Sequence, residues 1–146
     1  MKKNLKSHLT YCYYLSSIYN FNRYQKTLGE HDTCIGDVHN MMANVLFLQE
    51  KKDEALIHYE QSVKIYKLNS ENPLAIAQGL NNIAIILKSK GELEKALEYY
   101  QESLKIKKSS LEENSPSIAS TLNNIASLYQ EKELYEDALV YCQVRI

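Results

Sequence analysis

The stretch Ile76-Ala77-Gln78-Gly79-Leu80-Asn81-Asn82-Ile83-Ala84 decides the fold, because it returns with few changes 42 residues later. The later copy reads Ile118-Ala119-Ser120-Thr121-Leu122-Asn123-Asn124-Ile125-Ala126. Self-similarity at a fixed period of this length is the signature of repeat architectures. The sequence beyond each copy matches at the same spacing, with Lys95-Ala96-Leu97 followed by Asp137-Ala138-Leu139. The chain is therefore built from copies of one structural unit.

An earlier and more diverged copy precedes these two. It matches the middle copy at a spacing of 41 residues through Asn40, Ala43, Leu46, Ala55, Leu56 and Tyr59. Thr27-Leu28-Gly29-Glu30 also resembles Ser110-Leu111-Glu112-Glu113. Residues 1–28, which are basic and rich in tyrosine, are thus expected to be the end of a partial repeat. Residues 29–146 are expected to form three helix hairpins over 32–67, 72–110 and 115–146, the last of them truncated.

Each copy is expected to contain two helices. Asn72 can cap a helix whose first residue is Pro73, a position where the missing N–H of proline costs nothing. Ser115-Pro116 repeats this start, and Asp32 stands at the same register. Apolar residues then recur at three- and four-residue steps, the period of an amphipathic helix. In the middle copy they are Leu80, Ile83, Ala84 and Leu87 on the first helix, and Leu93, Ala96, Leu97, Tyr100 and Leu104 on the second.

A pair of alanines marks where the two helices of a hairpin cross. One small residue on each helix lets the two backbones approach closely, while larger residues fill the space beside the crossing. The alanines of a pair are 12 residues apart in all three copies: Ala43 with Ala55, Ala84 with Ala96, and Ala126 with Ala138.

At these residues the chain resembles the tetratricopeptide repeat (TPR) family, and more narrowly the long-period repeats of kinesin light chains. Leu80 to Ala84, its copy Leu122 to Ala126 and the run Thr27 to His31 carry the resemblance. It implies an all-α fold, a right-handed superhelix of stacked antiparallel helix hairpins (a TPR-like α-solenoid). The glycine expected between the helices is replaced by Glu50 and Glu133 in the outer copies.

The candidate site lies on the side of each first helix opposite the packing residues. An asparagine side chain can donate to and accept from a peptide backbone at once. We therefore expect a concave, Asn-lined groove that holds peptide segments of partner proteins, and in the resembling family this stripe is where partner peptides bind. The alternative is that these asparagines bond between neighbouring helices. The candidate residues are Asn40, Asn44, Phe47, Asn81, Asn82, Ile85, Lys88, Asn123, Asn124, Ser127 and Gln130.

Composition and motifs narrow the class of function. A net charge of −1 offers no basic surface for nucleic acid, and no apolar run approaches the length of a membrane span. Three widely spaced cysteines favour a reducing compartment, so we expect a cytoplasmic protein. His31, Cys34 and His39 lie close in sequence, but their spacing does not suit one metal site. No phosphate loop or catalytic triad is visible, so we predict no enzyme activity, no cofactor and no metal.

Three functional hypotheses remain open at this stage. The first is a protein–protein interaction module that presents its groove to peptides. The second is a cargo adaptor similar to kinesin light chains, a specific case of the first. The third is a regulatory or oligomerising repeat arm of a larger protein. The third gains weight because the chain ends at Ile146, inside the expected last helix.

Overall fold

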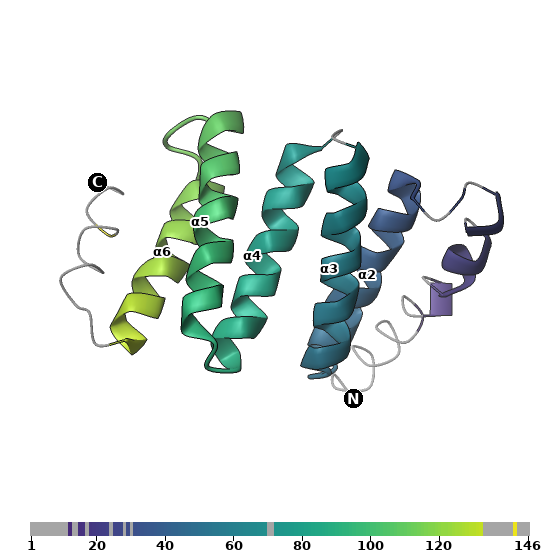
Figure 1. The fold of residues 1–146 in the computed structure, drawn as a ribbon, viewed down its shortest axis with the longest axis horizontal. Coiled ribbons are helices and arrows are strands. Elements are labelled where there is room, and N and C mark those ends of the chain that lie inside the picture. The colour runs from purple at the N-terminus through teal and green to yellow at the C-terminus, as the bar shows by residue number, and fades with distance from the viewer. Residues whose placement is uncertain are drawn as a thin grey trace. The chain divides into compact units, whose positions relative to one another are not determined.

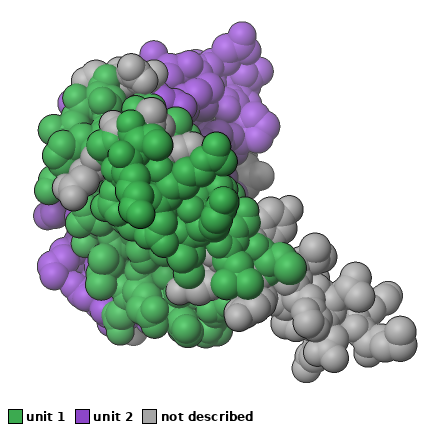
Figure 2. All heavy atoms as spheres, turned by 90° about the vertical axis from the view of Figure 1, so that its right-hand side faces the viewer, with its two compact units in different colours: residues 1–71 green, residues 72–146 purple. Residues whose placement is uncertain are grey.

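The computed structural model describes residues 12, 15–16, 18–23, 25–27, 29, 31–69, 72–132 and 142. These residues form α-helices and no strand, which confirms the all-α class. They belong to two compact units, residues 1–71 and residues 72–146 (Figure 2). The expected second helix of the last hairpin lies almost wholly outside the described residues.

Unit 1 contains the hairpin of α2 (Thr33–Leu48) and α3 (Lys52–Asn69), and described residues between 12 and 27 are also helical. Unit 2 contains α4 (Pro73–Ser89), α5 (Leu93–Ser110) and α6 (Pro116–Glu131) (Figure 1). In each unit the two helices of a hairpin pack along one another, and α6 contacts both α5 and α4.

The starts of the first helices follow the expected capping chemistry. The Asn72 side chain accepts a hydrogen bond from the backbone N–H of Ala75 at 3.1 Å, and Pro73 occupies the first turn. Asp32 and Ser115 cap α2 and α6 in the same way, each accepting from a backbone N–H two residues on. Each cap satisfies a backbone donor that the helix itself leaves without a partner.

The alanine pairs are shielded from solvent where the helices of each hairpin meet. Ala43 and Ala55 of unit 1 are both 0% exposed, and so are Ala84 and Ala96 of unit 2. Large side chains one turn further along the second helices are buried as well, including Tyr59 at 3% exposure and its counterpart Tyr100 at 1%. The predicted burial of these alanines is thus confirmed.

A serine on the second helix ties each hairpin together at a second point. The Ser62 hydroxyl donates to the carbonyl of Gly36 at 2.8 Å, and the Ser103 hydroxyl donates to the carbonyl of Ala77 at 2.6 Å. Both serines are buried. The donor and the acceptor are 26 residues apart in both hairpins, so the same hydrogen bond recurs in each of these two repeats.

The turn between the helices requires a left-handed residue. Gly91 has φ of 80° in unit 2, and Glu50 has φ of 62° at the same position of unit 1. The N–H of the next residue, Lys51 or Glu92, reaches back five residues to a helix carbonyl at 3.0 Å in both turns. This backbone pattern is a Schellman motif, which favours glycine at the left-handed position.

Substituting Ala84→Leu should lower the free energy of unfolding by about 1–3 kcal/mol, because the extra carbons have no space at the crossing. Chemical denaturation followed by circular dichroism measures the change. Gln78→Leu is the control, since it adds a similar side chain at an exposed position of the same helix. Equal stability of the Ala84→Leu protein and the wild type would contradict the packing described.

Substituting Glu50→Gly should raise the free energy of unfolding by about 0.5–1 kcal/mol, because it removes a left-handed non-glycine residue. The Glu50–Lys52 ion pair at 3.9 Å is exposed and contributes little. Gly91→Ala should have the opposite effect; a Cβ at Gly91 meets no atom within 4 Å, so the penalty comes from the backbone alone. Thermal melts that shift in the same direction for both variants would be inconsistent with this account.

Candidate interaction surface

The candidate stripe of unit 1 lies on α2 and consists of Asn40, Asn44 and Phe47. Asn44 is exposed, and the other two side chains are partly buried. The Tyr59 hydroxyl of α3 donates to Asn44 Oδ1 at 2.6 Å. Burial raises the pKa of Tyr59 to about 12, so this hydroxyl stays protonated at neutral pH. Asn44 therefore has its carbonyl oxygen already engaged with the partner helix.

Asn81 of unit 2 is less accessible than the sequence pattern suggested. It is only 6% exposed, and its Oδ1 accepts from Thr121 Oγ1 and from Asn124 Nδ2 of α6, both at 3.4 Å. We expected its amide to lie at least partly open to solvent, and the burial corrects that expectation. The periodicity of α4 carried no information on how closely α6 covers this residue.

The other candidate residues of α4 and α6 lie at or near the surface. Asn123 and Gln130 are exposed, whereas Asn82, Ile85, Asn124 and Ser127 are partly buried. Asn82 Oδ1 accepts from Gln78 Nε2 of the same helix at 3.2 Å. These side chains are accessible enough for a ligand to reach them.

Lys88 links α4 to α6 at the other end of the stripe. Its ammonium donates to Ser127 Oγ at 2.6 Å and forms an ion pair with Glu131 at 3.1 Å. The stripes of α4 and α6 are therefore joined at two places, near Asn81 and near Lys88. The charge of the only lysine in the candidate set is also neutralised locally.

A buried lysine, which the sequence analysis did not single out, adjoins this surface. Lys107 of α5 is 3% exposed, and burial lowers its pKa. It donates to Thr121 Oγ1 at 2.9 Å and to the carbonyl of Ser117 at 3.4 Å, and no described carboxylate forms an ion pair with it. Lys107 follows Ser103 by four residues and Leu104 by three, which places it on the packing face of α5. This spacing could have predicted its burial from the sequence.

Two histidines of unit 1 form a further polar contact inside a hairpin. His39 Nδ1 of α2 lies 2.8 Å from His58 Nδ1 of α3, and the ring of Phe21 packs edge-on against His39. Burial, and secondarily the charge of His58, lower the pKa of His39 to about 4. Burial also lowers the pKa of His58, and Glu54 opposes that shift.

The described residues were expected to hold neither a metal centre nor a membrane span. Among them, no three His, Cys, Asp or Glu side chains are grouped as metal ligands. His39, which is near Cys34 in sequence, pairs with His58 instead. No helix in the described part of the chain is both long and apolar enough to cross a bilayer.

Comparison with known proteins identifies the family. Tetratricopeptide repeat models match residues 40–68 and residues 75–143, which together make up more than half of the chain. The chain belongs to the tetratricopeptide repeat family.

Its relatives define the kind of repeat. The chain is 33% identical over 92 residues to Protein KINESIN LIGHT CHAIN-RELATED 3 of Arabidopsis thaliana, covering 57% of this chain and 14% of that protein. BtubC (BKLC) from P. vanneervenii is 26% identical with a TM-score of 0.73, covering 78% of this chain and 46% of that one. Repeats of a putative kinesin light chain from Podosopora anserina share the fold, with a TM-score of 0.77 at 18% identity over 99% of this chain and 74% of that one.

The repeats are therefore kinesin light chain-like, and the chain is a protein–protein interaction module. It spans less than half the length of the Arabidopsis protein and of BtubC. What those whole proteins do is consequently a matter of proposal for this chain.

Acid should destabilise unit 1 through the histidine pair. In the unfolded chain, the two histidines bind protons near pH 6.5, whereas in the folded state their pKa values are lower. Stability is therefore fully present above about pH 6.5 and falls as the pH drops toward 4. His39→Leu introduces the residue that the later copies have at the same register, Leu80 and Leu122. The wild type should lose about 1–2 kcal/mol more unfolding free energy than this variant between pH 7 and pH 5.

Urea denaturation at a series of pH values measures this effect. His31→Gln is the matched control, because His31 is exposed. A His39→Leu protein whose stability fell with acid as steeply as the wild type would show that the pair does not resist protonation.

Proposed function

We propose that the α4–α6 face of unit 2 binds an extended peptide segment of a partner protein, and that the chain performs no catalysis. One observation carries the proposal: the Asn81–Asn124 and Lys88–Ser127 hydrogen bonds join the stripes of the two helices into one surface. Repeat proteins of this architecture use the first helices of successive repeats as their binding wall.

The chemistry of this surface suits a peptide backbone better than a charged group. Amide side chains supply both donors and acceptors, and Ile85 adds an apolar contact. Lys88 is already paired with Glu131, so it is a poor partner for a chain-terminal carboxylate. We therefore expect an internal peptide segment rather than a carboxylate tail.

The proposal extends to unit 1 by register. Asn40, Asn44 and Phe47 stand on α2 where Asn81, Ile85 and Lys88 stand on α4. Within unit 1, the α2 stripe would offer a peptide the same amide chemistry, with Phe47 as its apolar contact. We also propose a cytoplasmic location, in keeping with the expectation from the cysteines.

A more specific candidate is a cargo adaptor similar to kinesin light chains. The sequence identity to Protein KINESIN LIGHT CHAIN-RELATED 3 and the similarity to BtubC support it. Heptad repeats in the same gene product would favour this candidate. A catalytic domain there would favour a regulatory arm, and self-association in sedimentation would favour an oligomerising one.

The peptide-binding proposal is tested by selecting a random peptide library on the full chain and measuring the affinity of selected peptides. Asn82→Ala combined with Gln130→Ala should weaken binding by about tenfold, since two net hydrogen bonds of about 0.5–1.5 kcal/mol each are lost. Lys105→Ala, at an exposed position of α5, is the control and should bind the peptides as the wild type does.

Thermal melts separate binding from folding. The Asn82/Gln130 double variant should melt like the wild type, whereas Asn81→Ala should melt lower because it removes the acceptor of Asn124 and one of the two acceptors of the Thr121 hydroxyl. Failure to select any peptide, or equal affinity of the double variant and Lys105→Ala, would contradict the proposed function.

A further inference from the structure

Two histidines face each other where α2 and α3 of unit 1 pack together. The rings of His39 and His58 meet through their Nδ1 atoms, because the ring centres are 5.1 Å apart whereas the two nitrogens are 2.8 Å apart. Both side chains are partly buried. Phe21 packs edge-on against the His39 ring, with the ring centres 5.2 Å apart. A pair of imidazole nitrogens is thus held in place inside the hairpin.

The packing of a hairpin does not require histidines at these positions. In the middle copy of the repeat, Leu80 stands at the register of His39 and Tyr99 at that of His58. Leu80 is 1% exposed, so an apolar side chain fills its position in α4. A polar ring removed from water costs free energy unless it is hydrogen-bonded. The histidine pair is therefore a special feature of unit 1.

Both imidazoles are neutral near pH 7 and can act as ligands. Burial, and secondarily the charge of His58, lower the pKa of His39 to about 4, and burial also lowers the pKa of His58. A neutral ring has one nitrogen with a hydrogen and one with a lone pair. One Nδ1 therefore donates across the contact, and the other accepts. Neither Nε2 has a hydrogen-bond partner among the described residues, and no solvent-shielded side-chain nitrogen there lacks one, so both Nε2 atoms reach solvent.

A metal ion fits between the two Nδ1 atoms after a small rearrangement. Bonds from a metal to imidazole are about 2.0–2.1 Å long, so two nitrogens at an angle of about 90–110° on one ion are about 2.9–3.4 Å apart. The observed 2.8 Å would widen by at most about 0.6 Å. The terminal torsion of a histidine is soft, so both rings can turn their lone pairs to a common point. The hydrogen on the donor Nδ1 moves through water to Nε2 of the same ring, and no net proton is released.

We propose that His39 and His58 bind one divalent ion of a late first-row transition metal, with water in the remaining coordination positions. Imidazole suits Cu²⁺ and Zn²⁺, with Cu²⁺ bound more tightly, whereas Mg²⁺ and Ca²⁺ prefer oxygen ligands. Glu54 precedes His58 by one helical turn, and its charge raises the pKa of His58. The same negative charge favours a bound cation.

This site is separate from the proposed peptide surface of unit 2 and gives unit 1 a role of its own. It has two protein ligands, in keeping with the lack of any three-residue metal cluster among the described residues. The sequence analysis expected no metal because it compared His39 with its neighbours in sequence, whereas the second ligand comes from α3, 19 residues further on. A bound ion would link α2 to α3 and stabilise the folded hairpin, because the unfolded chain does not hold the two rings together.

Isothermal titration calorimetry of the full chain with Zn²⁺ measures the binding. The wild type should bind one ion at this site, and Mg²⁺ should not bind. His39→Leu and His58→Tyr introduce the residues that the middle copy has at these positions, so both variants should remain folded. Each should weaken Zn²⁺ binding by at least about tenfold, because one of two protein ligands is lost. In the ¹⁵N-labelled wild type, Zn²⁺ should shift the ring nitrogen signals of both histidines.

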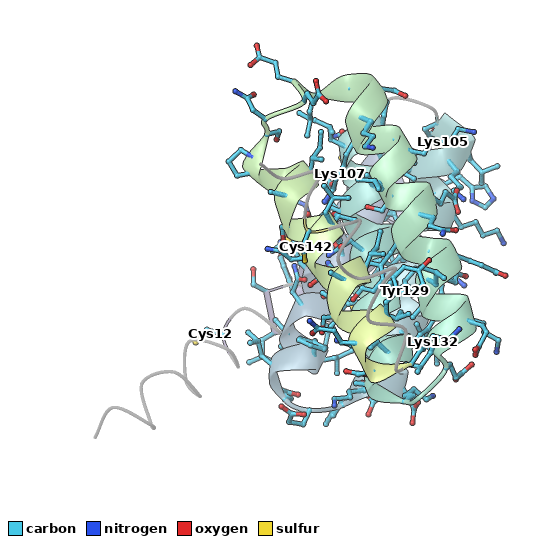
Figure 3. The ribbon with its side chains drawn as sticks, turned by 90° about the vertical axis from the view of Figure 1, so that its left-hand side faces the viewer. Cys12, Lys105, Lys107, Tyr129, Lys132 and Cys142 are labelled. Atoms are coloured by element: carbon cyan, nitrogen blue, oxygen red, sulfur yellow. The ribbon has the colours of Figure 1, made fainter. Side chains whose placement is uncertain are left out.

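The cysteines and the exposed histidine provide the controls. Thiolates also bind these metals; Cys12 and Cys142, labelled in Figure 3, are exposed, and Cys34 is partly buried. The variant with all three replaced by serine should bind Zn²⁺ as the wild type does, and Cu²⁺ more tightly. His31→Gln removes an exposed histidine of the same unit and should also bind normally.

Thermal melts give an independent measure, since an ion that binds only the folded state raises the melting temperature. Zn²⁺ should raise it for the wild type, for His31→Gln and for the serine variant, but not for His39→Leu or His58→Tyr. A wild type that binds no Zn²⁺ at millimolar concentrations would overturn the inference. Binding that survives His39→Leu, or that disappears in the serine variant, would overturn it too, because the ion would then have other ligands.

Discussion

The close approach of two helices at a pair of buried alanines is the constraint on which each hairpin depends. With no side chain beyond Cβ at Ala84 and Ala96, the α4 and α5 backbones can come close enough for the Ser103 hydroxyl to reach the Ala77 carbonyl at 2.6 Å. The same holds in unit 1, where Ser62 reaches Gly36. An added Cβ at Gly36 would lie 3.1 Å from the Tyr66 ring, a tight contact that a small shift of the ring would have to relieve. The stripe on each first helix keeps its place because this crossing fixes the helix.

Much of the fold was predictable because its determinants are local. Asn72 and Ser115 cap helices through their own neighbours, and the glycine expected between the helices of the middle copy, Gly91, has a positive φ. The burial of Asn81 was not predictable, because it depends on the approach of α6, which a helical period does not encode. The burial of Lys107 was missed for a related reason. A lysine is normally expected to be exposed, and only its position in the helical period placed it on the packing face.

Under the proposed function, the α4–α6 face would combine helix packing and peptide binding in one set of side chains. Asn81 and Lys88 hold the helices together, while Asn123 and Gln130 remain exposed. The interpretation of the asparagines as interhelical links therefore holds for Asn81 and Asn124, whereas the interpretation of the exposed members as groove residues stays a prediction. An amide has enough hydrogen-bonding sites to serve its neighbour and a ligand together, so structural use of one site need not remove a residue from recognition.

The serine-to-carbonyl bonds have a consequence for how such a chain changes over generations. Donor and acceptor lie 26 residues apart in both hairpins, well inside one period of the sequence. When unequal recombination duplicates or deletes a whole period, it therefore copies or removes both the donor and the acceptor. Neither group is left without the other. The Lys107–Thr121 bond is different, since it connects one period to the next. The residue of unit 1 at the position of Lys107 is Tyr66, which instead donates to Asp37 within its own hairpin. Loss of the period that follows Lys107 would thus leave the remaining hairpins intact but remove the Thr121 partner of Lys107.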